Sequence, residues 1–157
     1  MGFAISEMQL NSTAFESRTD IPKKHTGEGE DLSPMLEWTK APEEARSFIV
    51  ICHDPDAPLI TPGTYGFVHW VLYNIPDSVT VLPEGTSEYT KGVNDSGKEG
   101  YNGPMPPEGH GPHHYFFWVL ALKEDLNLEP GLTLWQVLER VEPYVIGMNR
   151  LVGIYER

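Results

Sequence analysis

Four stretches of the chain consist mainly of apolar residues and are bounded by proline, glycine or charged residues. β-Branched and aromatic side chains dominate them, which predicts β-strands, and their nearly continuous apolar character predicts burial on both faces. A weaker alternation in FAISEMQL (3–10) predicts an opening strand. The four strong candidates are RSFIVICHD (46–54), GFVHWVLYNIP (66–76), HHYFFWVLALK (113–123) and the shorter RLVGIYER (150–157).

One helix is predicted late in the chain. Thr133 and Gln136 have the spacing of a capping box, in which each side chain bonds the backbone N–H of the other. Pro143 is expected to end or bend the helix and Gly147 to cap it, which gives about ten helical residues. Helical spacing also places four apolar side chains on one face: Leu134, Val137, Leu138 and Val141.

The order of these elements indicates the fold class. Strands and helices do not alternate regularly, which disfavours a doubly wound parallel fold. The chain has 15 glycines and 14 prolines, which predicts many turns, and residues 21–34 read as a long surface loop. At 157 residues it fits one domain, so we expect a single mostly-β domain spanning 1–157.

Charge and targeting signals narrow the class of protein. The formal net charge of −12 repels nucleic-acid phosphates and anionic membrane surfaces, so neither is an expected partner. No apolar run reaches the roughly 18–20 residues of a membrane span, and the first residues lack the pattern of a signal peptide. Cys52, the single cysteine, lies in an apolar run and excludes an intrachain disulfide. We therefore expect a cytoplasmic protein without stable membrane insertion.

The stretch DPDAP contains the first candidate chemistry. Asp54 and Asp56 are two residues apart, so in an extended segment they would share a side. Neighbouring prolines restrict the backbone and would hold the two carboxylates in place. The segment alone is equally compatible with a turn whose aspartates face solvent.

His69 is a second candidate because it interrupts an apolar strand. A buried imidazole must hydrogen-bond through at least one ring nitrogen. An aspartate at the end of the neighbouring strand would supply the partner and raise the pKa of His69. A satisfied core histidine is the alternative.

The third candidate is GYNGPMPPEGHGPHHYFF (100–117). Its glycines and prolines predict a compact loop whose backbone N–H groups can face an anion. The loop delivers His110 and then His113, where the next strand begins. By alternation Tyr115 shares the face of His113, whereas His114 points the opposite way. A plain surface loop is the alternative.

Three classes of catalytic site find little support. The histidines and carboxylates suggest a metal, but no helical H-E-x-x-H ligand pair is present. No G-x-S-x-G nucleophile elbow occurs either. Paired carboxylates suggest a glycosidase, yet nothing else resembles a sugar platform. We expect no metal and no cofactor.

The three motifs together resemble a known family. DPDAP, HWVLYNIP and GYNGPMPPEGHGPHHYFF are similar to the signature regions of the phosphatidylethanolamine-binding proteins. IPKKHTGEGEDLSPMLEW and LVGIYER resemble the bacterial and archaeal branch, often called Raf-kinase-inhibitor-like proteins, and the resemblance runs from about residue 21 to the end. It implies a central antiparallel sheet packed against a smaller sheet, with a few short peripheral helices.

The resemblance also implies a small pocket for phosphate, phosphoethanolamine or similar anions. His114 departs from the family pattern, since it stands where the family commonly has arginine. The pocket residues carried over to this sequence are Asp54, Asp56, Pro58, His69, Gly103, Pro104, Met105 through its backbone N–H, His113 and Tyr115.

The expected function is anion binding in a regulatory protein without an established reaction. Asp54 would hold His69 or His113 protonated and oriented, while backbone N–H groups and the Tyr115 hydroxyl donate to the anion. Besides the anion or phosphorylated headgroup, we expect a protein partner whose identity the sequence does not give. The alternatives are a hydrolase that uses the His/Asp pocket, and an interaction module that inhibits a kinase or protease through its loops.

Overall fold

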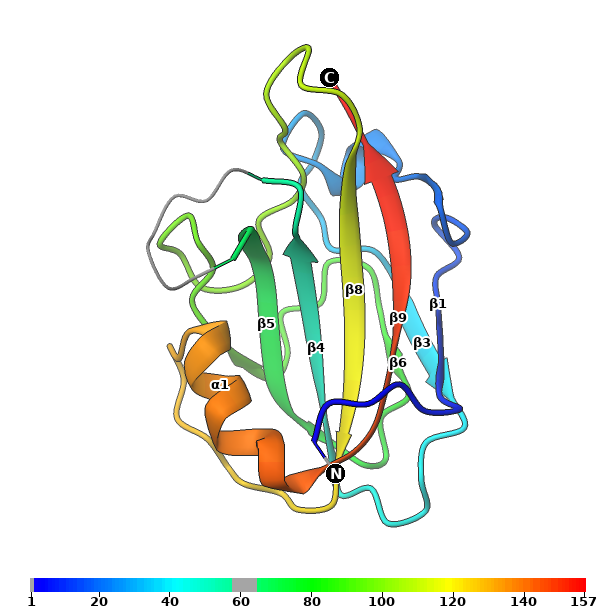
Figure 1. Cartoon of the computed structure of the whole chain (residues 1–157), viewed down its shortest axis with the longest axis vertical. Coiled ribbons are helices and arrows are strands. Elements are labelled where there is room, and N and C mark those ends of the chain that lie inside the picture. Colours follow the sequence, from blue (N-terminus) through cyan, green and yellow to red (C-terminus); the bar gives the residue numbers. More distant parts are fainter. Residues whose placement is uncertain (1, 58–64) are drawn as a thin grey trace.

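The computed structural model describes residues 2–57 and 65–157. Most of the regular structure is strand, and the helices are short (Figure 1). The elements in chain order are β1 (Gln9–Asn11), β2 (Thr19–Asp20), η1 (Lys23–His25), β3 (Leu36–Thr39), β4 (Ser47–Asp54), β5 (Phe67–Pro76), β6 (Val81–Leu82), β7 (Thr90–Lys91), β8 (His113–Leu122), α1 (Leu134–Val141), η2 (Glu142–Tyr144) and β9 (Val145–Tyr155).

The strands form two sheets. The main sheet has six strands in the order β2-β9-β8-β4-β5-β7, and the smaller sheet has the order β1-β3-β6. Neighbouring strands are antiparallel, except that β2 runs parallel to β9 at one edge. The predicted mostly-β class, with two sheets and short helices, is confirmed.

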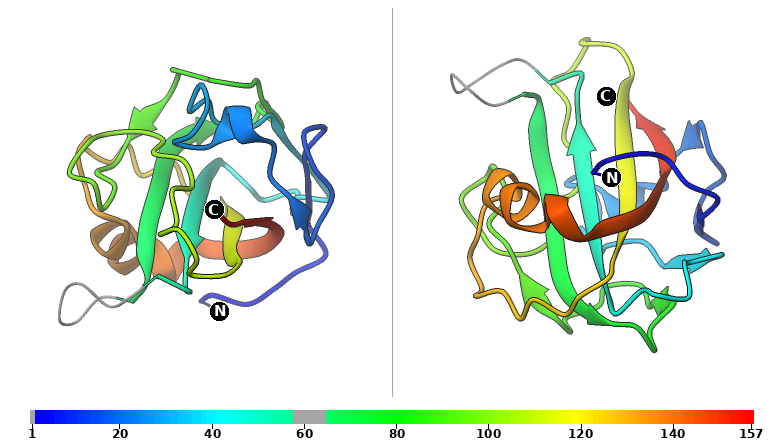
Figure 2. Two further views of the ribbon diagram at one scale, coloured as in Figure 1. Left: turned by 90° about the horizontal axis from the view of Figure 1, so that it is seen from above. Right: turned by 60° about the horizontal axis from the view of Figure 1, so that its bottom comes forward.

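The central strands are buried on both faces because each face of the main sheet has its own cover. Alternate residues of β4 contact different clusters: Phe48, Val50 and Cys52 pack toward the smaller sheet, whereas Ile49 and Ile51 pack toward α1. Figure 2 shows the smaller sheet and α1 on opposite sides of the main sheet. This arrangement explains why the apolar runs lack a polar face.

The helix begins as predicted and ends differently. Thr133 and Gln136 form both hydrogen bonds of the capping box. The α-helix stops at Val141, and Pro143 lies in the short 3₁₀ turn that follows. The prediction that Gly147 caps the helix is wrong, because the chain enters β9 at Val145 and Gly147 pairs with Ala121 of β8.

Two other predictions differ from the structure in extent. β9 is eleven residues long, because pairing along the whole of β8 extends it beyond the apolar run that marks it in the sequence. The segment 21–34 is more than a surface loop, since His25 and Thr26 are buried. Within residues 2–57 and 65–157, no helix is long and apolar enough to cross a membrane.

Candidate functional site

A small cavity of about 180 Å³ lies where β4 ends and where β5 and β8 begin. Antiparallel pairing brings these strand ends together, so residues distant in the sequence meet at one end of the main sheet (Figure 1). The loop that precedes β8 supplies the remaining wall. The cavity is lined by Asp54, Ala57, Phe67, His69, Asn102, Gly103, Met105, Pro106, Pro107, His113 and Tyr115.

The polar centre of the cavity is the pair formed by Asp54 and His113. The Nδ1 atom of His113 lies 2.7 Å from Oδ2 of Asp54, and both side chains are almost fully buried. The other oxygen, Oδ1, accepts a hydrogen bond of 2.8 Å from the backbone N–H of Asp56. Because a carboxylate only accepts, His113 carries its proton on Nδ1 and presents Nε2 on its other side.

A β-bulge turns His69 toward the cavity. Cys52 pairs with Trp70 and His53 pairs with Val68, so His69 is an extra residue in β5. Strict alternation would place His69 and Trp70 on opposite faces. The bulge removes that constraint, as bulges commonly do beside functional sites.

The hydrogen-bond partner of His69 differs from the predicted one. Its Nδ1 lies 2.5 Å from the backbone oxygen of Asn102, and not beside a carboxylate. The expected rise in the pKa of His69 is also wrong. Burial lowers the pKa of His69, and this effect outweighs the bond to Asn102 and the more distant charge of Asp54, which both raise it. His69 is therefore neutral at neutral pH.

Tyr115 completes the polar lining with a phenol that stays protonated. It is 1% exposed, and burial together with the charge of Asp54 raises its pKa far above the ordinary value. The ring packs edge-on against His69, with 5.2 Å between centroids. Its hydroxyl can thus donate a hydrogen bond throughout the physiological pH range.

The wall that precedes β8 is held by backbone contacts. The N–H of Gly103 donates to Oδ1 of Asp31 over 2.8 Å, in a position where a Cβ atom would collide with the backbone at His25 and Thr26. Gly103 and Met105 line the cavity as predicted. Pro104 is buried behind it, and its carbonyl accepts from Gly27.

Asp56 lies outside the cavity, and the prediction that it shares a side with Asp54 is wrong. The chain turns after Asp54, because its side chain accepts from the Asp56 N–H in a local turn. Asp56 instead bonds the backbone N–H and ring of His114, both at 2.7 Å. His114 points away from the cavity, as alternation predicts. Pro58 lies outside the described residues.

Sequence reasoning missed three polar contributors to this site. Asp31 holds the loop wall through the N–H of Gly103, and the carbonyl of Asn102 holds the ring of His69. His110 contacts the ring of His113, with 2.8 Å between Nδ1 of His110 and Nε2 of His113. The bonds of Asp31 and Asn102 join residues far apart in the sequence, so no local pattern reports them. The only sequence feature that points to His110 is its place in the loop that leads into His113 and His114.

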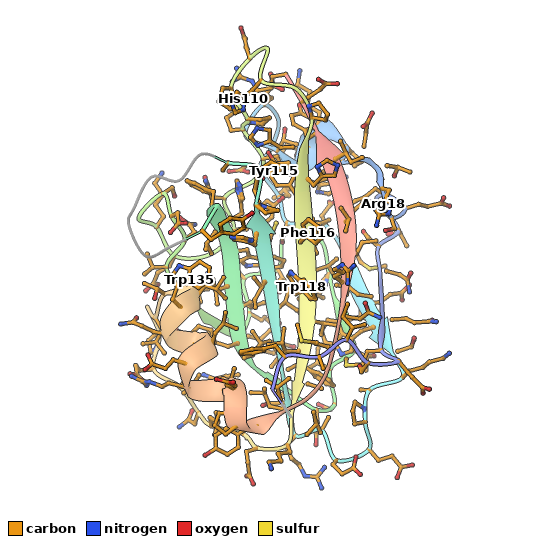
Figure 3. All side chains as sticks on the ribbon, viewed as in Figure 1. Arg18, His110, Tyr115, Phe116, Trp118 and Trp135 are labelled. Carbon is orange, nitrogen blue, oxygen red and sulfur yellow. The ribbon has the colours of Figure 1, made fainter. Side chains whose placement is uncertain are left out.

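A larger cavity of about 460 Å³ lies on the opposite face of the main sheet, between β4, β8 and α1. Its lining is almost entirely apolar and includes Phe116, Trp118 and Trp135, which Figure 3 labels. His53 belongs to this lining, so its position next to Asp54 in the sequence does not make it part of the polar site.

No cluster of three or more histidine, cysteine, aspartate or glutamate side chains is arranged to hold a metal ion in the described part of the chain. The small cavity itself offers three sets of donors and acceptors. These are the Asp54–His113 pair, neutral His69 and the phenol of Tyr115.

Comparison with known proteins places the chain in a family. The model described as phosphatidylethanolamine-binding protein matches residues 11–156. The chain is 43% identical to the UPF0098 protein of Methanothermobacter thermautotrophicus, over 96% of this chain and 99% of that protein. It is 42% identical to the UPF0098 protein of Pyrococcus abyssi, over 100% and 90% respectively.

Solved structures agree with the sequence comparison. A phosphatidylethanolamine-binding protein homologue from Chlamydia trachomatis superposes with a TM-score of 0.88 at 37% identity, over 96% of this chain and 97% of that one. The E. coli protein YBCL, described as a new member of the mammalian PEBP family, superposes with a TM-score of 0.86 at 32% identity. That match covers 97% of this chain and 99% of YBCL. The chain belongs to the phosphatidylethanolamine-binding protein family, in the branch of its bacterial and archaeal members.

Proposed function

We propose that this protein binds a phosphate-type anion, either free phosphate or a phosphorylated headgroup, in the small cavity and acts as a binding or regulatory protein. The observation that carries the proposal is the buried Asp54–His113 pair beside the Tyr115 phenol. Buried charged groups need partners, and an imidazole held by a carboxylate can supply a charged donor to an anion.

The carboxylate of Asp54 has an indirect role in this proposal. An anion placed directly against it would be repelled by about 1 to 4 kcal/mol at 4 Å, for effective dielectric constants of 80 to 20. Both oxygens of Asp54 already accept hydrogen bonds from the protein. Asp54 therefore orients His113, while His113 and Tyr115 donate to the ligand.

Neutral His69 adds selectivity for a protonated ligand. Its Nδ1 faces a carbonyl oxygen, so the proton resides on Nδ1 and Nε2 is an acceptor. An acceptor in the cavity suits a phosphate oxygen that still carries its proton. Sulfate has no such proton near neutral pH, so we expect phosphate to bind more tightly than sulfate.

Isothermal titration calorimetry with inorganic phosphate and with phosphoethanolamine tests the proposal. Asp54→Asn should weaken binding about tenfold, since it removes the carboxylate that orients His113. Tyr115→Phe should weaken it about as much, since it removes a hydrogen bond to the charged ligand. Asp56→Asn is the matched control and should bind as the wild type does. Phosphate affinity should rise between about pH 8 and pH 6, as phosphate takes up a proton that neutral His69 can accept in a hydrogen bond. Affinity that is flat or that rises with pH would contradict the scheme.

The lining of the cavity also bears on the hydrolase alternative. Among the described residues that line it, there is no serine, threonine, cysteine or lysine. This composition favours binding over a hydrolase that uses one of these nucleophiles. A regulatory role through an unidentified cytoplasmic partner is consistent with the proposal, and partner capture that survives Tyr115→Phe would assign that role to the loops instead.

A further inference from the structure

The apolar cavity between β4, β8 and α1 has the size of a small-molecule site. Its volume of about 460 Å³ lies within the roughly 300–1,000 Å³ that ligand pockets usually occupy. Phe3 and Tyr65 line it, and they are two of the five large apolar side chains that the described part of the chain leaves exposed. Exposed apolar groups thus gather at this cavity, which is typical of a binding surface.

Aromatic rings from both the sheet and the helix line the cavity. Phe116 and Trp118 project from the same face of β8, with 6.3 Å between their ring centroids and 19° between their planes. Trp135 lines it from α1, and its ring lies edge-on to that of His53, with 6.0 Å between centroids. Figure 3 shows Phe116, Trp118 and Trp135 on the side of the main sheet that carries α1. Rigid rings of this kind suit a flat aromatic ligand, because aromatic groups attract one another in offset and edge-on arrangements.

Arg150 of β9 lies at the rim of the same cavity. It pairs directly with Trp118 of β8, so the two side chains project from the same face of the sheet. The guanidinium carbon of Arg150 lies 5.4 Å from the centroid of the Trp118 ring. Met148, two residues earlier on the same face of β9, also lines the cavity. Strand pairing and a cation–π contact therefore hold a positive charge beside the apolar lining.

This arginine has no acidic partner in the protein, although acidic residues outnumber lysine and arginine by 23 to 11. Within residues 2–57 and 65–157, no carboxylate lies at salt-bridge distance from Arg150. A guanidinium matches a carboxylate through two parallel N–H···O bonds. The cavity and its rim are thus complementary to a small molecule that joins an apolar ring to a carboxylate.

We propose that the apolar cavity binds a small aromatic carboxylate, with its ring among Phe116, Trp118 and Trp135 and its carboxylate on Arg150. This site is separate from the small polar cavity, because residues on opposite faces of β8 line the two. Binding there does not require that the small cavity hold phosphate.

Calorimetry with cinnamate and with cinnamamide at about pH 7 tests the two parts of the site. The two molecules share one flat apolar body, but only cinnamate is charged at that pH. Cinnamate should bind about tenfold more tightly, since a hydrogen bond between two charged groups exceeds one to a neutral amide. Octanoate, a flexible carboxylate of similar size, should bind more weakly than cinnamate. Tighter binding of octanoate would refute the aromatic class of ligand.

Two substitutions separate the charge from the apolar wall. Arg150→Met should weaken cinnamate binding about tenfold and leave cinnamamide unchanged, a difference that a general loss of folding would not produce. Trp135→Leu should weaken both molecules about fivefold, because it removes an aromatic contact that they share. Arg46→Met is the matched control, since Arg46 is exposed and donates to the carbonyls of Glu43 and Ala45. It should bind both molecules as the wild type does.

Tyr115→Phe shows which cavity cinnamate occupies. It changes the small cavity and should leave the affinity for cinnamate unchanged. If it weakens cinnamate binding, the ligand lies in the small cavity and the proposed site is refuted. The site is also refuted if Arg150→Met weakens both molecules equally, if either Arg150→Met or Trp135→Leu has no effect, or if the wild type does not bind cinnamate. Phosphate binding is measured separately, so none of these results decides the proposed function.

Discussion

At the residue scale, His69 links burial to the pH dependence of stability. Burial lowers its pKa in the folded state, whereas in the unfolded chain it titrates near about 6.5. As the pH falls below that value, the unfolded chain takes up a proton that the folded protein does not bind. His69 therefore makes the protein less stable on acidification, by at most about 1.4 kcal/mol per pH unit.

His69→Asn tests this link, because asparagine can still donate to the Asn102 carbonyl but does not titrate. Urea unfolding at about pH 7.5 and about pH 5.5 should show a smaller loss of stability on acidification than in the wild type. His114→Ala, which changes a partly exposed histidine outside the cavity, should reproduce the loss seen in the wild type. Equal losses in His69→Asn and the wild type would show that other groups dominate the acid response.

The sequence predicted some site residues for reasons that the structure retains. Alternation along one strand is a local rule, so it correctly separated His113 and Tyr115 from His114. The same rule failed for Asp54 and Asp56, because the chain is not extended between them. The side chain of Asp54 accepts a hydrogen bond from the N–H of Asp56, and the chain turns there. It also gives no account of why His69 enters the cavity, since a bulge depends on the pairing of two strands.

At the element scale, the capping box of α1 is the clearest local determinant. Thr133→Ala removes the oxygen that accepts from the Gln136 N–H and should lower the free energy of unfolding by about 1 kcal/mol. Urea unfolding measures the loss. Thr80→Ala changes an exposed threonine outside the helix and should stay within about 0.5 kcal/mol of the wild type. A similar loss in both variants would mean that the cap contributes no special stability.

Element boundaries were predictable only where the signal is local. The start of α1 depends on residues three apart, so the sequence identifies it. The end of α1 and the start of β9 depend on long-range pairing, because Val145 pairs with Leu122 of β8. For the same reason β1 contains only the last two residues of the predicted opening strand, and begins where Gln9 meets Thr39.

At the scale of the whole molecule, the net charge of −12 opposes anion binding. Raising the ionic strength from about 0.01 M to about 0.15 M shortens the Debye length from about 30 Å to about 8 Å. This screening weakens the repulsion between phosphate and the acidic surface, so the association rate should rise with added salt. Stopped-flow measurements would check this, and a rate that falls with salt would indicate a positive local field strong enough to override the overall charge.

The architecture was predictable in class and less so in connectivity. Apolar runs without a polar face correctly indicated strands buried on both sides. That β2 pairs in parallel with β9 could not be foreseen, since a two-residue strand of exposed residues has no pattern of its own. Family resemblance supplied the two-sheet arrangement, and the structure confirms it.

The two-sided burial of β8 has a consequence for how this lineage can diverge. Substitutions at His113 or Tyr115 change the small polar cavity, whereas those at Phe116 or Trp118 change the apolar cavity beside α1. Effects at residues that share no partners are close to additive. Descendants can therefore accumulate changes on the apolar face, and acquire new ligands or partners there, while the small polar cavity on the other side of the same strand remains as inherited.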